Sequence, residues 1–202
     1  MTTNVLEYLR KSANEYPEKI AVIDENKRMT FSQINTYAMQ LASHILSECG
    51  EIYNKPIAVY MDKGIDCIVA FMGILYSGNF YVPIDKKSPR ERIEKILEVL
   101  EPIAVISQSG QINDRERWIN IDYEAGKDSS FDEGELMRHL SNVLDIDPVY
   151  VLFTSGSTGI PKGVAINHRS IIDYTEWLHN KFGFDDQTVF GEQAPFYFDN
   201  SI

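Results

Sequence analysis

The stretch YVLFTSGSTGIPKGVAINH, from Tyr150 to His168, decides the fold expected for this part of the chain. Its two apolar runs, YVLF and GVAI, have the composition of buried strands. The stretch therefore predicts a strand, a polar loop and a second strand, with a helix starting at His168. The loop consists of nine residues, mostly glycines and hydroxyl side chains: Thr154, Ser155, Gly156, Ser157, Thr158, Gly159, Ile160, Pro161 and Lys162.

The composition of this loop fits a phosphate-binding cradle. Glycine lets backbone N–H groups approach a ligand closely, hydroxyls add hydrogen bonds, and Lys162 adds positive charge. The loop is not a Walker A motif, because Gly163 follows Lys162 where that motif has serine or threonine. No helix N-terminus directly follows the loop, so the hydroxyls must contribute more to phosphate binding. We therefore expect a nucleotide triphosphate ligand and a loop that becomes ordered on binding it, although these residues alone also allow a flexible glycine–serine turn.

Upstream of this stretch, apolar strands alternate with helices. Near-continuous apolar strands joined by helices indicate a parallel sheet that is covered on both faces. The expected fold class is therefore three-layer α/β, with a mostly parallel sheet and helices on both faces. The chain begins with an amphipathic helix and a short hairpin, and further strands are expected at residues 57–61, 80–84 and 103–107, with helices at 33–49 (capped by Ser32), 65–76 and 89–101.

Residues 122–147 break this alternation. Acidic residues outnumber basic ones there, which favours a solvated surface excursion with one helix near residues 135–144. No internal repeat or linker divides the chain. Its 202 residues are expected to form one domain or one large subdomain.

Charge and cysteine content exclude several classes of protein. The net charge of −11 would repel nucleic acids and anionic membranes. Cys49 and Cys67 lie in apolar helical patterns and are predicted to be buried free thiols, which suits a reducing cytoplasm. The uncharged run from Cys67 to Ile84 is broken at Ser77–Asn79, so it predicts a buried helix and a strand, not a membrane span. With no leader pattern at the N-terminus, a cytoplasmic location is expected.

Four separated motifs resemble those of the adenylate-forming enzymes. FTSGSTGIPKGV (Phe153 to Val164) matches their YTSGSTGxPKGV at every position but the first. MTFSQI (Met29 to Ile34) is similar to LTYxEL, and SGNFYVPIDKKSPRERI (Ser77 to Ile93) resembles AGxAYVPIDPxxPxERI. FDNS (Phe198 to Ser201) resembles the FDxS of amino-acid-activating members. The chain is thus similar to the adenylation domains of nonribosomal peptide synthetases and to D-alanine carrier-protein ligases.

This resemblance implies a reaction and a set of site residues. The family condenses a carboxylate with ATP, assisted by Mg²⁺, and then transfers the acyl group to the phosphopantetheine thiol of a carrier protein. Lys162 and Thr154 are the implied catalytic residues, and the phosphates would be held by Thr154, Ser155, Gly156, Ser157, Thr158, Gly159 and Lys162. Asp199 would bind the α-ammonium of an amino-acid substrate, and Phe198 would line the same pocket, which the flanking aromatics predict to be buried. Glu192 stands where the D-alanine ligases have Asn, which leaves the identity of the amino acid open.

The histidines are predicted to lie outside this chemistry. His168 is expected to be a surface residue at the start of a helix, and His44, His139 and His179 do not form a metal-binding spacing.

The family's chains are more than twice as long as this one. Residues 1–202 are therefore interpreted as the N-terminal portion of an AMP-binding domain, without the ribose-binding aspartate and the C-terminal lid lysine. We expect negligible adenylation by these residues alone. Two alternatives stay open: an acyl-CoA synthetase, and a non-catalytic nucleotide-binding or interaction module that self-associates through an open sheet edge.

Overall fold

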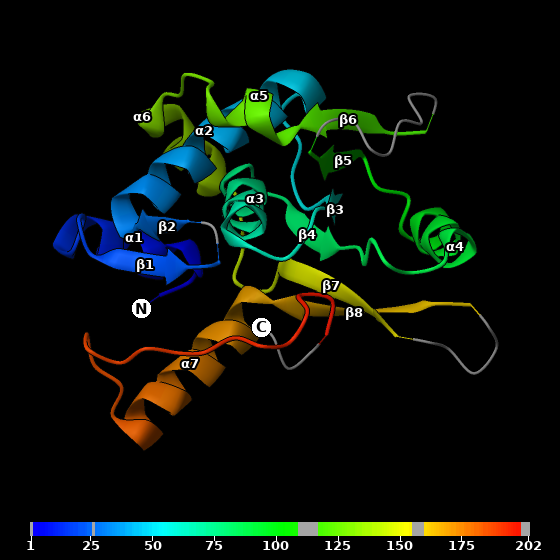
Figure 1. The fold of residues 1–202 in the computed structure, drawn as a ribbon. Coiled ribbons are helices and arrows are strands. Elements are labelled where there is room, and N and C mark those ends of the chain that lie inside the picture. The colour runs from blue at the N-terminus through cyan, green and yellow to red at the C-terminus, as the bar shows by residue number, and fades with distance from the viewer. Residues whose placement is uncertain (1, 26, 109–116, 155–159, 199–202) are drawn as a thin grey trace.

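The computed structural model describes residues 2–25, 27–108, 117–154 and 160–198. Among these residues, a six-stranded sheet has the order β6-β5-β3-β4-β7-β8, and all neighbouring strands are parallel except β7 and β8 (Figure 1). A two-stranded antiparallel sheet pairs β1 with β2. The strands are β1 (Ile20–Ile23), β2 (Arg28–Thr30), β3 (Pro56–Tyr60), β4 (Phe80–Pro83), β5 (Ala104–Ser107), β6 (Ile119–Asp122), β7 (Pro148–Thr154) and β8 (Lys162–Asn167).

Helices cover both faces of the sheet, as the strand pattern predicts. Side chains of a strand point alternately to its two faces, so Ile57 and Val59 pack into the larger core while Ala58 packs into the smaller one. α2 and α3 contribute to the larger core, and α4 covers the opposite face (Figure 1). The helices are α1 (Leu6–Glu15), α2 (Phe31–Cys49), α3 (Ile65–Tyr76), α4 (Arg90–Leu100), α5 (Tyr123–Lys127), α6 (Glu133–Leu140) and α7 (His168–Phe182).

The uncharged run is a buried helix followed by a strand, as predicted. α3 packs tightly against α2 at Gly73: a Cβ added there would lie only 2.9 Å from Leu41 Cδ2 of α2. Glycine therefore allows the two helices to approach closely. In the described ranges, no helix has both the length and the apolar character needed to cross a membrane.

Three local predictions need correction. α2 is capped by Thr30 and not by Ser32: Thr30 Oγ1 accepts a hydrogen bond from the Gln33 N–H, and the Gln33 side chain accepts one from the Thr30 N–H. Residues 119–127 form the strand β6 and the helix α5, neither of which was predicted, because the acidic residues from Asp122 onward indicated a surface excursion. Asp122 caps α5. Cys67 is a buried free thiol, whereas Cys49 is free but only partly buried.

Candidate functional site

The predicted phosphate loop joins β7 and β8, which form an antiparallel hairpin. β3, β4, β5, β6 and β7 run in the same direction, so their carboxyl ends meet at one edge of the sheet, and the loop begins at that edge. Ligands of open α/β sheets bind at this edge. The strand-to-strand course of the loop is confirmed.

The two ends of the loop face each other. Thr154 ends β7 opposite Lys162, which begins β8, and Thr154 Oγ1 donates a 3.4 Å hydrogen bond to the Lys162 carbonyl. Next to them, a Cβ added at Gly163 would lie 2.8 Å from Val151 Cγ1, so the hairpin requires glycine there. The other predicted phosphate contacts, Ser155, Gly156, Ser157, Thr158 and Gly159, lie outside the described residues.

A cavity of about 490 Å³ opens beside the start of the loop. Its walls come from the end of β7, the segment after β4, the face of α4 and residues 197–198. Sites for small molecules commonly have volumes of roughly 300–1,000 Å³. The cavity is lined by Pro83, Ile84, Asp85, Ser88, Arg92, Ile93, Ile96, Leu152, Phe153, Thr154, Tyr197 and Phe198.

Polar groups on the segment after β4 face this cavity. Asp85 accepts hydrogen bonds from the Ser88 hydroxyl at 2.9 Å and from the Lys87 backbone N–H at 2.9 Å. Burial and the neighbouring Asp85 carboxylate raise the pKa of the Tyr197 hydroxyl. Arg92 contributes a cation from the first turn of α4. Asp85, Ser88 and Arg92 were not predicted as site residues, although Asp85 and Ser88 belong to a polar segment after a predicted strand and Arg92 belongs to the helix predicted at residues 89–101.

The substrate motif reaches the same cavity. Phe198 lines it together with Thr154, 44 residues earlier in the chain. The flanking aromatics were expected to indicate a buried pocket. Phe196 is only partly buried, where it packs on the larger core, and Phe198 is 55% exposed, so this expectation is wrong for Phe198. Phe198 lines the open cavity and does not belong to a core cluster. Asp199 lies outside the described residues.

A second cavity of about 320 Å³ shares Pro83, Ile84, Asp85 and Tyr197 with the first, and Gln193, Pro195 and Phe196 also line it. Lys86 forms a 2.8 Å ion pair with Asp62 there. Lys63 donates hydrogen bonds to two backbone carbonyl oxygens near the C-terminal end of the described chain. Its Nζ lies 2.6 Å from the Ala194 carbonyl oxygen and 2.9 Å from the Glu192 carbonyl oxygen. The C-terminal segment is thus fastened to the same edge of the sheet as the phosphate loop.

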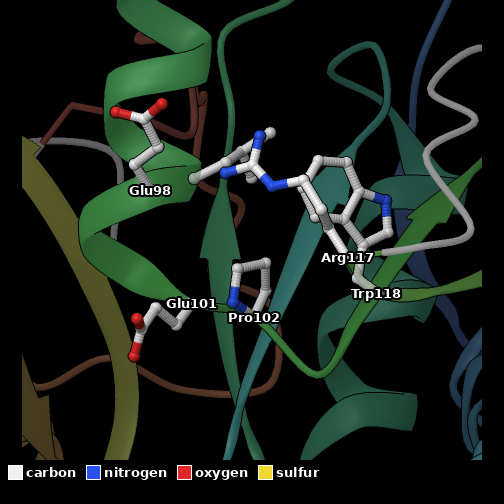
Figure 2. A pocket seen from close by; sticks show the side chains of 6 residues that line it. Glu98, Glu101, Pro102, Arg117 and Trp118 are labelled. Carbon is white, nitrogen blue, oxygen red and sulfur yellow. The ribbon is translucent and has the colours of Figure 1, made fainter.

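A third cavity, of about 470 Å³, lies away from this edge. It is lined by Leu97, Glu98, Glu101, Pro102, Arg117 and Trp118 (Figure 2). Pro102 precedes β5 and Trp118 precedes β6, so the cavity lies at the amino ends of the strands. None of its lining residues belongs to the cavity that Thr154 lines.

His168 was predicted to be a surface residue, and this prediction is wrong. It is 2% exposed, its Nδ1 accepts a 3.2 Å hydrogen bond from the Val5 N–H, and burial lowers its pKa to about 4. His139 is also buried, with Nε2 3.0 Å from the Ser77 carbonyl oxygen. Both histidines have structural roles. The described residues contain no group of three or more His, Cys, Asp or Glu side chains that could hold a metal ion.

Comparison with known proteins identifies the family of this chain. The AMP-binding enzyme family matches residues 9–202. The chain is 31% identical to tyrocidine synthase 1 of Brevibacillus parabrevis, over 98% of this chain and 18% of the synthase. It is also 31% identical to the D-alanine--D-alanyl carrier protein ligase of Bacillus cytotoxicus, over 98% of this chain and 39% of the ligase.

A solved structure shows the same fold. The N-terminal subdomain of NpsA from Klebsiella oxytoca, in complex with 3-hydroxybenzoyl-AMSN, superposes with a TM-score of 0.80 at 20% identity, over 98% of this chain and 49% of that one. The family match extends over residues 9–202, which is nearly the whole chain. The chain belongs to the AMP-binding enzyme family.

Proposed function

We propose that the protein containing this chain activates an amino acid with ATP and transfers it to a carrier protein. One observation carries this proposal: Thr154 and Phe198 line the same cavity. The first belongs to the motif expected to hold the phosphates of ATP, and the second adjoins the residue expected to hold the amino acid. A single site could therefore bring both substrates together.

The first step joins the amino-acid carboxylate to ATP. A carboxylate oxygen attacks the α-phosphorus and pyrophosphate leaves, so the barrier includes repulsion between two anions. We assign the screening of this repulsion to Lys162 and to the hydroxyls of Thr154, Ser155, Ser157 and Thr158, with Gly156 and Gly159 giving backbone access. Arg92 adds a cation to the wall of the same cavity. Mg²⁺ would arrive with ATP, because it binds mainly through substrate phosphates and water.

Asp199 is assigned to the α-ammonium of the substrate. A carboxylate in an apolar stretch of sequence is costly to bury without a cation, and an ammonium group supplies one. Phe198, the residue that precedes Asp199 in the sequence, lines the cavity. The substrate class is therefore an amino acid, with its identity open.

The second step transfers the aminoacyl group to the phosphopantetheine thiol of a carrier protein. The thiol attacks the acyl carbon and AMP leaves, so the product is a thioester. This assignment rests on the relatives, one of which is a ligase for a carrier protein.

ATP–pyrophosphate exchange tests the first step. The protein containing this chain is assayed with a panel of amino acids and with 3-hydroxybenzoate and fatty acids, which lack the amine. Exchange dependent on an amino acid and abolished in Asp199→Asn supports the proposal. Exchange driven by acids without an amine would favour the acyl-CoA synthetase alternative.

We further propose that residues 1–202 alone are inactive, since they span 39% of the matched ligase. This is tested by assaying the 202-residue chain beside the longer protein; robust exchange by the short chain would refute it.

One observation favours the interaction module as a second candidate. β8 forms one edge of the sheet in the described part of the chain, and most of its residues are exposed. An exposed edge strand can pair with a strand of another copy. Size-exclusion mass and ATP calorimetry separate the two functions, because a non-catalytic module would associate without binding ATP.

A further inference from the structure

Lys63 fastens a distant segment to the sheet. It lies in the loop between β3 and α3, at the carboxyl edge. Its Nζ donates to the carbonyl oxygens of Glu192 and Ala194 at 2.9 and 2.6 Å, and lies 3.5 Å from Glu192 Oε1. It also lies 5.3 Å from the centroid of the Phe196 ring. One ammonium group thus contacts three residues of the segment that leads to Phe198.

Glu192 takes part in the same arrangement. Its Oε1 accepts a 2.6 Å hydrogen bond from the Ala194 N–H, which closes a tight turn around the lysine. The ion pair itself is partly exposed, so it contributes little by itself. The two charge-assisted bonds to carbonyl oxygens are the stronger contribution, because an ionised donor strengthens a hydrogen bond.

Two further contacts fix the segment beyond this turn. Phe196 packs edge-on against Phe71 of α3, with ring centroids 5.4 Å apart, and Phe71 stacks on Tyr81 of β4 at 4.1 Å. Tyr197 lies beside Asp85, in the segment after β4. The chain is therefore held next to the carboxyl ends of β3 and β4 immediately before it reaches the large cavity.

We propose that Lys63 is a positioning residue for amino-acid binding: it holds residues 192–198 so that Phe198, at the start of the predicted substrate motif, lines the same cavity as Thr154. This inference rests on the proposed function, because Asp199 must bind the substrate ammonium. In the part of the chain that the structure describes, Lys63 contacts Glu192, Ala194 and Phe196, and it does not line the cavity that Thr154 and Arg92 share. Loss of the Lys63 ammonium group should therefore raise the KM for the amino acid and leave the KM for ATP nearly unchanged.

Hydrogen exchange measured by mass spectrometry tests the structural part, in the protein that contains this chain. Lys63→Met keeps the length of the side chain and removes its donors, whereas Lys63→Arg keeps the charge. Peptides covering residues 188–198 should exchange about tenfold faster in Lys63→Met, as expected for the loss of a charge-assisted hydrogen bond. Lys63→Arg should recover part of the protection.

Lys86→Met is the matched control for this measurement. Lys86 lines the same small cavity but pairs with Asp62, so its removal should leave exchange at residues 188–198 unchanged. Peptides from β3 and β4 report whether the fold is intact in each variant. Unchanged exchange at residues 188–198 in Lys63→Met would overturn the inference.

Steady-state pyrophosphate exchange tests the link to substrate. In Lys63→Met the KM for the amino acid should rise about tenfold, while the KM for ATP stays within about twofold of wild type. Equal effects on both KM values, or faster hydrogen exchange without a change in the amino-acid KM, would overturn the positioning role. If the wild-type protein shows no amino-acid-dependent exchange, the proposed function fails, and hydrogen exchange still decides whether Lys63 holds the segment.

Discussion

Acidification is expected to destabilise this fold through His168. The imidazole is 2% exposed, and its Nδ1 accepts a hydrogen bond from the Val5 N–H, so α7 is tied to the start of α1. An imidazolium carries a proton on both ring nitrogens and cannot accept this bond. Protonation in the folded state therefore costs both the bond and the burial of a charge, which Asp147 and Asp145 offset only in part.

The magnitude follows from the pKa of this group. Burial lowers the pKa of His168 from 6.5 to about 4, so the folded chain binds this proton less readily than the unfolded chain. The stability contributed by the neutral imidazole is fully present above pH 6.5 and is lost as the pH falls from 6.5 toward about 4. Between about pH 7.5 and about pH 4.5, the loss in the free energy of unfolding is roughly 2–3 kcal/mol.

Urea unfolding at these two pH values measures the effect. Other groups also titrate in this window, so His168→Asn serves as the comparison: its amide oxygen can accept the Val5 N–H but does not titrate. The wild-type chain should lose about 2–3 kcal/mol more than the variant on acidification. The same loss in both proteins would refute the assignment to His168.

Three other substitutions have defined outcomes. Lys162→Ala should lower the turnover of pyrophosphate exchange at saturating amino acid, by about tenfold or more, because a cation beside the phosphates is lost. Gly163→Ala should destabilise the β7–β8 hairpin by about 1–3 kcal/mol in thermal unfolding, because the new Cβ would lie 2.8 Å from Val151 Cγ1. Thr30→Ala should cost about 1 kcal/mol in the same measurement, because α2 loses its cap.

Matched controls accompany these changes. Lys162→Arg keeps the charge and should retain more turnover than Lys162→Ala. Gly191→Ala adds a Cβ with nothing within 4 Å and should leave the melting temperature close to wild type. Ser32→Ala removes a hydroxyl that does not cap α2, so a cost equal to that of Thr30→Ala would contradict the capping assignment.

Local pattern was sufficient for much of the fold. The uninterrupted apolar strands predicted a parallel sheet with both faces covered, and the charge-free segment predicted the buried α3. The strand–loop–strand course around Thr154 and Lys162 was also correct. Each of these features depends on periodicity or composition within a few neighbouring residues. The true cap of α2 was missed even so, because Thr30 and Ser32 are both good capping residues and only the backbone geometry selects between them.

The sequence by itself supplied the candidate site residues, in the loop from Thr154 to Lys162 and the motif at Phe198. Only the tertiary structure decided which of them share a cavity. β4 pairs with β7 and not with β5, its successor in the chain, and this strand order puts Asp85 and Arg92 beside Thr154. The tertiary structure also buries His168 and brings Lys63 into contact with Ala194. Strand order depends on contacts between residues far apart in the chain, which no local pattern contains.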